Sequence, residues 1–192
     1  LTLALLRTSH GHFREGHYDE AQANANEALH LSQQLNHVQY EVEALDRLGE
    51  IAIHLGKHNQ ARQHINQALA VAKKRGLRKL EIELRRTMGL TYFWQQKFEQ
   101  AEEHFHLALQ ICEEIGDLQN ESRVWNNLGV VFQVIGNQYE ANQHFQNSLN
   151  IAKQFNLQWS LEAGNSNQGD ALMQMGAFTE AEACLQNALA FN

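Results

Sequence analysis

A period of 40 residues runs through the chain from end to end. Two columns of small residues mark it, namely Ala21, Ala61, Ala101, Ala141 and Ala181, and Gly49, Gly89, Gly129 and Gly169. Self-similarity at a fixed spacing is the signature of a repeat array, in which each unit packs mainly against its neighbours. The period therefore limits the fold to a row of similar units.

Each unit contains two apolar stripes with helical spacing. In the fourth unit these are Trp125, Leu128 and Phe132, followed by Ala141, Phe145, Ser148 and Leu149. Spacings of three and four residues place side chains on one face of a helix. Gly136 and Asn137 lie between the stripes and tolerate the backbone conformations of a tight turn. Between units, a further column consists of Asn36, Gly76, Gly116 and Asn156. Asparagine and glycine are the residues that best adopt the left-handed conformation at the end of a helix.

We therefore predict an all-α fold of five helix-turn-helix units in a single array. The units are expected at residues 1–37, 38–77, 78–117, 118–157 and 158–192. The ten helices are expected at 1–15, 18–35, 38–55, 58–75, 78–95, 98–115, 118–135, 138–155, 158–175 and 178–191. The two helices of a unit must cross closely at the small residues, so we expect Gly129 to face Ala141.

Composition narrows the classes of partner and compartment. A chain of 192 residues with 43% hydrophobic content can bury a core, and a net charge of -7 argues against binding to nucleic acid or anionic membrane. No apolar run approaches the roughly 20 residues of a membrane-spanning helix. Cys112 and Cys184 occupy different slots of the repeat, so we expect unpaired thiols and a cytoplasmic protein. Because Leu1 falls within an expected helix and Asn192 lies where another is finishing, we also expect a section of a longer protein.

The repeat resembles a known family. Trp125, Leu128, Gly129, Phe132, Ala141, Phe145 and Ser148 match the tetratricopeptide repeat in type and spacing. The 40-residue period is similar to the subclass found in LGN/Pins polarity adaptors, kinesin light chains and bacterial regulators. The resemblance implies a right-handed α-solenoid in which the first helix of each unit lines a concave groove. Arg85 and Asn165 depart from the pattern, because they replace the large apolar residue held by Trp125.

Candidate binding residues follow from the outward stripe of each first helix, combined with the groove that the resemblance implies. They are Arg47, Glu50, Arg86, Trp94, Arg123, Asn126, Asn127, Val130, Asn167 and Asp170. Asparagine amides can pair with a peptide backbone, arginine can hold a carboxylate, and tryptophan offers an apolar platform. Arg123 and Asn127 also match positions that contact partner peptides in LGN-like repeats.

Two classes of function remain open. The first is a scaffold or adaptor that binds a peptide or protein segment in the groove. The second is a sensory or regulatory module of a bacterial multidomain signalling protein or transcription regulator. A flanking helix-turn-helix or nucleotide-binding domain would favour regulation, whereas further repeats would favour an adaptor. Self-association through uncapped ends is a third possibility, and it predicts a mass that depends on concentration.

Metal binding and catalysis find little support in the sequence. His10, His12 and His17 lie near the first turn, but their spacing is not an established ligand set, so we expect surface histidines. The column His64, His104 and His144 recurs once per repeat, which is too far apart for one ion, and we expect half-buried contacts between repeats. No motif of a nucleophile, phosphate loop or zinc protease occurs. We therefore predict no metal, no cofactor and no enzymatic activity.

Overall fold

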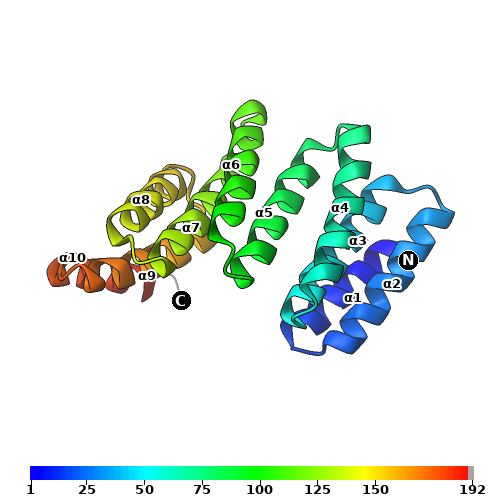
Figure 1. Ribbon diagram of the computed structural model, residues 1–192, viewed down its shortest axis with the longest axis horizontal. Helices are drawn as coiled ribbons and strands as arrows, with labels where there is room; N and C mark the ends of the chain where they lie inside the picture. Colours follow the sequence, from blue (N-terminus) through cyan, green and yellow to red (C-terminus); the bar gives the residue numbers. More distant parts are fainter. Residues whose placement is uncertain (190–192) are drawn as a thin grey trace. The chain divides into compact units, whose positions relative to one another are not determined.

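The computed structural model describes residues 1–189, and in this range the chain is all-α (Figure 1). The helices are α1 (Thr2–Arg14), α2 (Tyr18–Gln34), α3 (Val38–His54), α4 (His58–Arg75), α5 (Arg78–Trp94), α6 (Phe98–Ile115), α7 (Leu118–Val134), α8 (Gln138–Phe155), α9 (Gln158–Gln174) and α10 (Phe178–Leu189). Each described bound lies within one residue of the predicted one, and residues 190–191 of the last predicted helix lie outside the described range. The predicted class of tandem helical hairpins is confirmed.

The chain divides into two compact units, Leu1–Lys97 and Phe98–Asn192. In the first unit each helix from α1 to α5 packs against the next, and α3 also contacts both α1 and α5. In the second unit α6 packs on α7, α7 on α8, α8 on α9 and α9 on α10, and α7 also contacts α9. In both units, consecutive odd-numbered helices are therefore neighbours.

The turn inside each hairpin closes its first helix in the same way. Gly16 has a φ of +79°, and the amide of His17 donates to the carbonyl of His12 at 2.8 Å. This bond spans six residues and defines the Schellman closure of a helix. Gln96 takes the glycine position in the third hairpin with a φ of +58°, a conformation that costs a residue with a Cβ about 1–2 kcal/mol.

Other helix ends follow the expected turn chemistry. Asn156 closes α8 with a φ of 52°, as the asparagine and glycine column predicted. The side chain of Asp117 accepts a hydrogen bond from the amide of Asn120 at 3.2 Å and so caps the start of α7. Such caps satisfy backbone donors that have no partner within their own helix.

The small residues allow close packing within a hairpin, and the atoms nearest to Gly129 belong to Phe145 rather than to Ala141. A Cβ on Gly129 would lie 2.4 Å from the ring of Phe145, which is fully buried. A Cβ on Gly49 would lie 2.8 Å from Ile65, at the equivalent position of the second hairpin. Gly129 therefore accommodates the large residue four positions after Ala141, because that side chain projects from α8 towards α7.

Apolar clusters fill the first unit. One joins α3, α4 and α5 and includes Val42, Ile65, Leu84 and Met88. Another, between the first hairpin and α3, contains Ala21, Ala25, Leu48 and Ile51, all at most 2% exposed. A further one joins Leu6, Ala28 and Ala44 of α1, α2 and α3. The helices of this unit are thus held together by continuous burial of apolar side chains.

The second unit buries more polar groups. The hydroxyl of Ser122 on α7 lies 3.1 Å from that of Ser148 on α8, and both side chains are fully buried. Asn165, which replaces an aromatic residue of the repeat, is 2% exposed and donates to the carbonyl of Leu161 at 2.7 Å. Its amide is partly satisfied by its own helix, so the fifth hairpin accommodates the departure without an aromatic side chain.

Candidate functional site

In the first unit, charged side chains from α3 and α5 form a network on the surface of the odd-numbered helices. Arg47 pairs with Glu50 on α3. Arg86 on α5 lies 3.8 Å from the same Glu50 carboxylate, and its Nε donates to Glu83 at 3.0 Å. All four side chains are between 20% and 26% exposed. Three predicted site residues, Arg47, Glu50 and Arg86, are thus brought together by two neighbouring helices.

Asp46 lies beside this network. The pKa of its carboxyl is raised from 3.8 to about 7, mainly by burial and next by the negative charge of Glu50, while the positive charge of Arg86 opposes the shift. The Oδ1 atom is buried and has no hydrogen-bond partner among residues 1–189. Because the native carboxyl holds its proton more tightly than the unfolded one, its contribution to stability is full below pH 3.8 and is lost as the pH rises to about 7.

Aromatic side chains extend the same surface towards α1. The guanidinium of Arg47 lies 5.6 Å from the ring centroid of Phe13, within the range of a cation–π contact. Phe13 also packs edge-on against His54 with centroids 4.8 Å apart. Trp94, at the end of α5, is 59% exposed. Its role as an apolar platform for a ligand stays a prediction.

The second unit carries a more neutral surface on α7 and α9. The Asn167 amide donates to the Oδ1 of Asn126 at 3.0 Å, so two predicted residues from successive hairpins pair with each other. Asn126 is only 5% exposed. The guanidinium of Arg123 lies 5.3 Å from the ring centroid of Trp159. The surface therefore combines amides with a fixed arginine and indole.

The remaining predicted residues of this surface differ in exposure. The Nδ2 of Asn127 is buried and has no hydrogen-bond partner within the described chain. Val130 is half-buried against the cluster that contains Phe145 and Ala171, so much of it belongs to the core. Asp170 is exposed. Asn127 is thus the member of the set with an amide donor left to satisfy.

Phe13 and Trp159 were not among the predicted site residues. Phe13 contacts Arg47 across 34 positions, and Arg123 contacts Trp159 across 36. These separations are six and four residues, or about one to two helical turns, shorter than the 40-residue period. A search for partners at those offsets, rather than at the period itself, would have found them.

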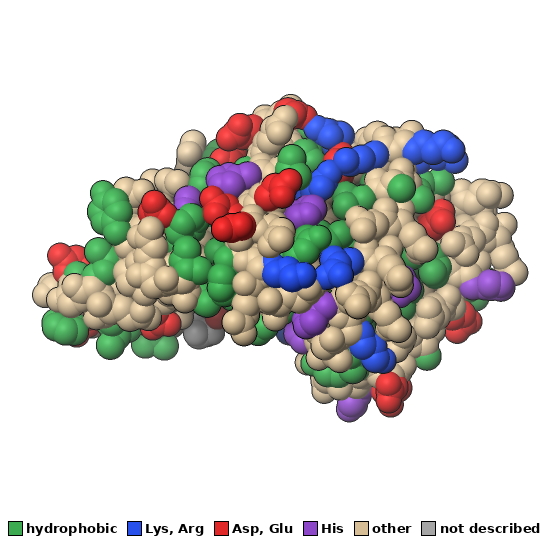
Figure 2. Space-filling view, viewed as in Figure 1, with side chains coloured by type: hydrophobic (Ala, Val, Ile, Leu, Met, Phe, Trp, Pro, Cys, Tyr) green, Lys and Arg blue, Asp and Glu red, His purple; other side chains and the backbone are tan. Residues whose placement is uncertain are grey.

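Basic side chains gather where α4 ends and α5 begins, as Figure 2 shows. The cluster is Lys73, Lys74, Arg75, Arg78 and Lys79. Glu81 lies beneath it, only 5% exposed, with a carboxylate oxygen 2.9 Å from Arg78. The net charge of -7 therefore conceals a local positive patch, and the absence of a nucleic-acid partner stays a prediction.

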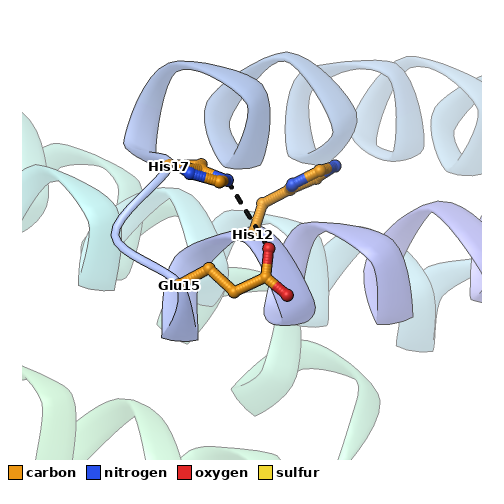
Figure 3. Close-up of side chains that lie close together, drawn as sticks. All are labelled: His12, Glu15 and His17. Atoms are coloured by element: carbon orange, nitrogen blue, oxygen red, sulfur yellow. Dashed lines mark ion pairs between the residues drawn. The ribbon is translucent and has the colours of Figure 1, made fainter.

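One group of side chains in the described range could hold a metal ion: His12, Glu15 and His17, at the turn between α1 and α2 (Figure 3). Their ligand atoms all lie within 4.8 Å of one another. The sequence had suggested His10, rather than Glu15, as the companion of His12 and His17. His144, of the second histidine group, is half-buried as expected. Its ring contacts with Trp125, at 5.4 Å, and with Phe132, at 5.0 Å between centroids, lie within its own hairpin and not between repeats.

Two further predictions concern the thiols and the membrane. Neither Cys112 nor Cys184 forms a disulfide within the described residues, as predicted. Among the described helices, none has the length and apolar character that crossing a lipid bilayer demands.

Comparison of the sequence with protein families gives two matches, both described as tetratricopeptide repeat. They cover residues 80–154 and residues 42–75. A comparison with curated protein sequences gives no match.

Several solved structures share the fold. A Rap protein complexed with Competence and Sporulation Factor has a TM-score of 0.85 and 15% identity over 97% of this chain and 52% of its own. The Rap conjugation gene regulator of plasmid pLS20, in complex with the Phr* peptide, has a TM-score of 0.78 and 17% identity over the same shares. A signal transduction ATPase with a tetratricopeptide repeat sensor, from Pyrococcus horikoshii, has a TM-score of 0.81 and 15% identity over 99% of this chain and 29% of its own. This chain thus spans about half of each Rap protein and less than a third of the ATPase.

Proposed function

Because the chain is a tetratricopeptide repeat protein, we propose that it binds a peptide or an extended segment of a partner protein on the surface of α7 and α9. Helical repeat proteins commonly bind partners on such extended surfaces. The single observation that carries the proposal is the buried, unpaired Nδ2 of Asn127. It lies on α7, four residues after Arg123 and next to the paired Asn126.

A buried amide donor without a partner costs a folded protein about 1–3 kcal/mol. Asn127 as a whole is only half-buried, so a rotation of its side chain would bring the amide to a peptide carbonyl and remove that cost on binding. The amide therefore favours a ligand that presents a backbone acceptor. This donor would bind a main-chain carbonyl of the ligand, whatever side chains the ligand carries. The expected ligand is therefore an extended peptide and not a small apolar molecule.

Arg123 and the Asn126–Asn167 pair support the same ligand class. The contact with Trp159 holds the Arg123 guanidinium in place, which lowers the entropy lost when it binds an acidic group. The amide of Asn167 joins α9 to α7 and so keeps the two sides of the surface together. The solved Rap regulator bound to the Phr* peptide gives an example of this fold with a peptide ligand.

The proposal can be tested by selecting peptides from a display library against the 192-residue chain. The affinity of a selected peptide is then measured by calorimetry for the native chain, for Arg123→Ala/Asn127→Ala, and for Asn147→Ala. Asn147 is a matched control because it is an exposed asparagine on α8. Loss of one charge-assisted and one neutral hydrogen bond should weaken binding about 30-fold or more.

The Asn147→Ala variant should bind as the native chain does. Circular dichroism of each variant checks that the helices remain. Failure to select any peptide, or equal affinity of the double variant and the native chain, would contradict the proposal.

A sensory or regulatory role is the second candidate. It is favoured by the likeness to a tetratricopeptide repeat sensor of a signal transduction ATPase and to a conjugation gene regulator. In that case a peptide bound at the α7–α9 surface would control a neighbouring domain. The sequence on either side of these residues in the whole protein decides between the two, because a nucleotide-binding or helix-turn-helix domain would favour the sensor. Neither role requires catalysis by this chain.

A further inference from the structure

The turn between α1 and α2 holds His12 and His17 close together through its backbone. Gly16 adopts the left-handed conformation, and the amide of His17 donates to the carbonyl of His12 at 2.8 Å. The amide of Gly16 donates to Phe13 at 3.1 Å and completes the closure. These bonds fix the distance between the backbones of His12 and His17 before any ligand binds.

The side chains converge on one side of this turn. The Nδ1 of His17 lies 3.5 Å from the Oε2 of Glu15, drawn as the dashed line in Figure 3. A tetrahedral ion with bonds of about 2.0–2.2 Å places neighbouring ligand atoms roughly 3.3–3.6 Å apart. One of the three edges therefore already has the length that a metal site requires.

The remaining edges need only side-chain movement. All three ligand atoms lie within 4.8 Å of one another, and the side chains of His17 and Glu15 are 58% and 65% exposed. Exposed side chains change rotamer freely, so they can close on an ion while the backbone stays in place.

His12 provides the ordered part of the set. Its side chain is half-buried, and its ring lies 6.1 Å from that of His17 between centroids. The Nδ1 of His12 is buried and makes no hydrogen bond to any described protein group. No protein acceptor or donor therefore competes with an ion for this atom of the ring.

The same turn in other hairpins lacks these ligands. The backbone bond from His17 to His12 recurs from Lys57 to Ala52, and from Ala177 to Leu172. Those positions carry no pair of histidines. The repeat itself therefore does not demand imidazoles here, and their presence in the first hairpin needs a separate explanation.

We propose that His12, Glu15 and His17 form a binding site for a divalent transition-metal ion of the Zn²⁺ class, with water at the remaining positions. Two imidazoles and one carboxylate suit zinc, cobalt, nickel and copper, whereas Mg²⁺ and Ca²⁺ prefer oxygen ligands. The ion would join the end of α1 to the start of α2. It would thus stabilise the first hairpin.

The test is calorimetric titration of the metal-free 192-residue chain with Zn²⁺, and separately with Mg²⁺. The native chain should bind one Zn²⁺ at this site, and Mg²⁺ should give no saturable heat. His17→Gln should weaken Zn²⁺ binding at least about tenfold, since even loss of a group that only orients a metal ligand costs 10–100-fold. Zn²⁺ should also raise the melting temperature of the native chain but not that of the variant.

His106→Gln is the matched control. His106 also lies 3.5 Å from a glutamate, Glu102, but the pair belongs to no three-ligand group in the described chain. This variant should bind Zn²⁺ as the native chain does. Glu15→Gln gives a second test should His17→Gln alter the circular dichroism spectrum. The proposal is overturned if the native chain shows no saturable Zn²⁺ binding, if both variants of the site bind normally, or if His106→Gln causes the same loss.

Discussion

Replacement of Gly129 by alanine tests how the two helices of a hairpin approach each other. An added Cβ would lie 2.4, 2.5 and 2.9 Å from three ring carbons of Phe145. Ordinary carbon contacts are about 3.5–4.0 Å, so the ring or the helix must move by roughly 1 Å. Phe145 is fully buried, so its ring cannot avoid the added methyl group by moving into solvent.

Two opposing effects set the magnitude. Alanine in a helix is favoured over glycine by about 0.5–1 kcal/mol, whereas overpacking a core costs about 1–3 kcal/mol. We expect Gly129→Ala to lower the free energy of unfolding by about 1–2 kcal/mol. For a chain of this length that corresponds to a fall of about 2–8 °C in melting temperature.

Thermal and urea denaturation followed by circular dichroism measure the change. Gly11→Ala is the matched control, because Gly11 lies in α1 and a Cβ there would meet no atom within 4 Å. It should stabilise the chain by about 0.5–1 kcal/mol. Phe145→Leu should cost less in the Gly129→Ala background than in the native chain, since a smaller side chain relieves the clash. If Gly129→Ala proves as stable as Gly11→Ala, the proposed close packing is wrong.

The remaining predictions concern one buried acid and one strained turn. Asp46→Asn should change the free energy of unfolding more favourably at pH 8 than at pH 4, by about 1–3 kcal/mol. At pH 8 the native carboxyl, with its pKa raised to about 7, must be ionised while buried, whereas the asparagine amide stays neutral. Urea denaturation of both proteins at the two pH values measures this, and a difference independent of pH would refute it. Gln96→Gly should raise the stability by about 0.5–1 kcal/mol, since Gln96 has a φ of +58°, and Gly136→Gln should do the reverse at a φ of +87°. Thermal denaturation that shows the same sign for both changes would exclude backbone strain as the cause.

Local features of the fold could be predicted because they depend on neighbouring residues in the chain. The helical stripes and the glycine and asparagine columns placed all described helix bounds within one residue. Asn156 at the end of α8 and the caps of α7 follow from the same local chemistry. Period and turn residues therefore contain enough information to define the hairpins.

Contacts between helices could not be predicted from the period alone. We predicted that Gly129 faces Ala141 where the helices cross. Helical side chains lean towards the start of their helix, so the side chain of Phe145, one turn after Ala141, reaches Gly129. The partners Glu50 and Arg86 are 36 positions apart for the same geometric reason. Asn126 was expected on the outward stripe of its helix, and its low exposure depends on α9, which the sequence of α7 does not reveal.

The histidine cluster shows a second limit of sequence reasoning. The sequence grouped His10 with His12 and His17, because the three histidines are close to one another along the chain. The structure instead brings Glu15 to His17, since the left-handed residue Gly16 turns the chain between them. Ligand sets that depend on such a turn require the closing hydrogen bonds to be known.

The network on α3 and α5 has a consequence for how any charged guest would bind there. Arg47, Glu50, Glu83 and Arg86 already neutralise one another. A carboxylate or ammonium group of a ligand would have to displace one of the side chains from its present ion pair. One ion pair would then replace another, so the net gain in Coulomb energy would be small. Association at this surface should therefore vary little with ionic strength and should tolerate guests of different charge.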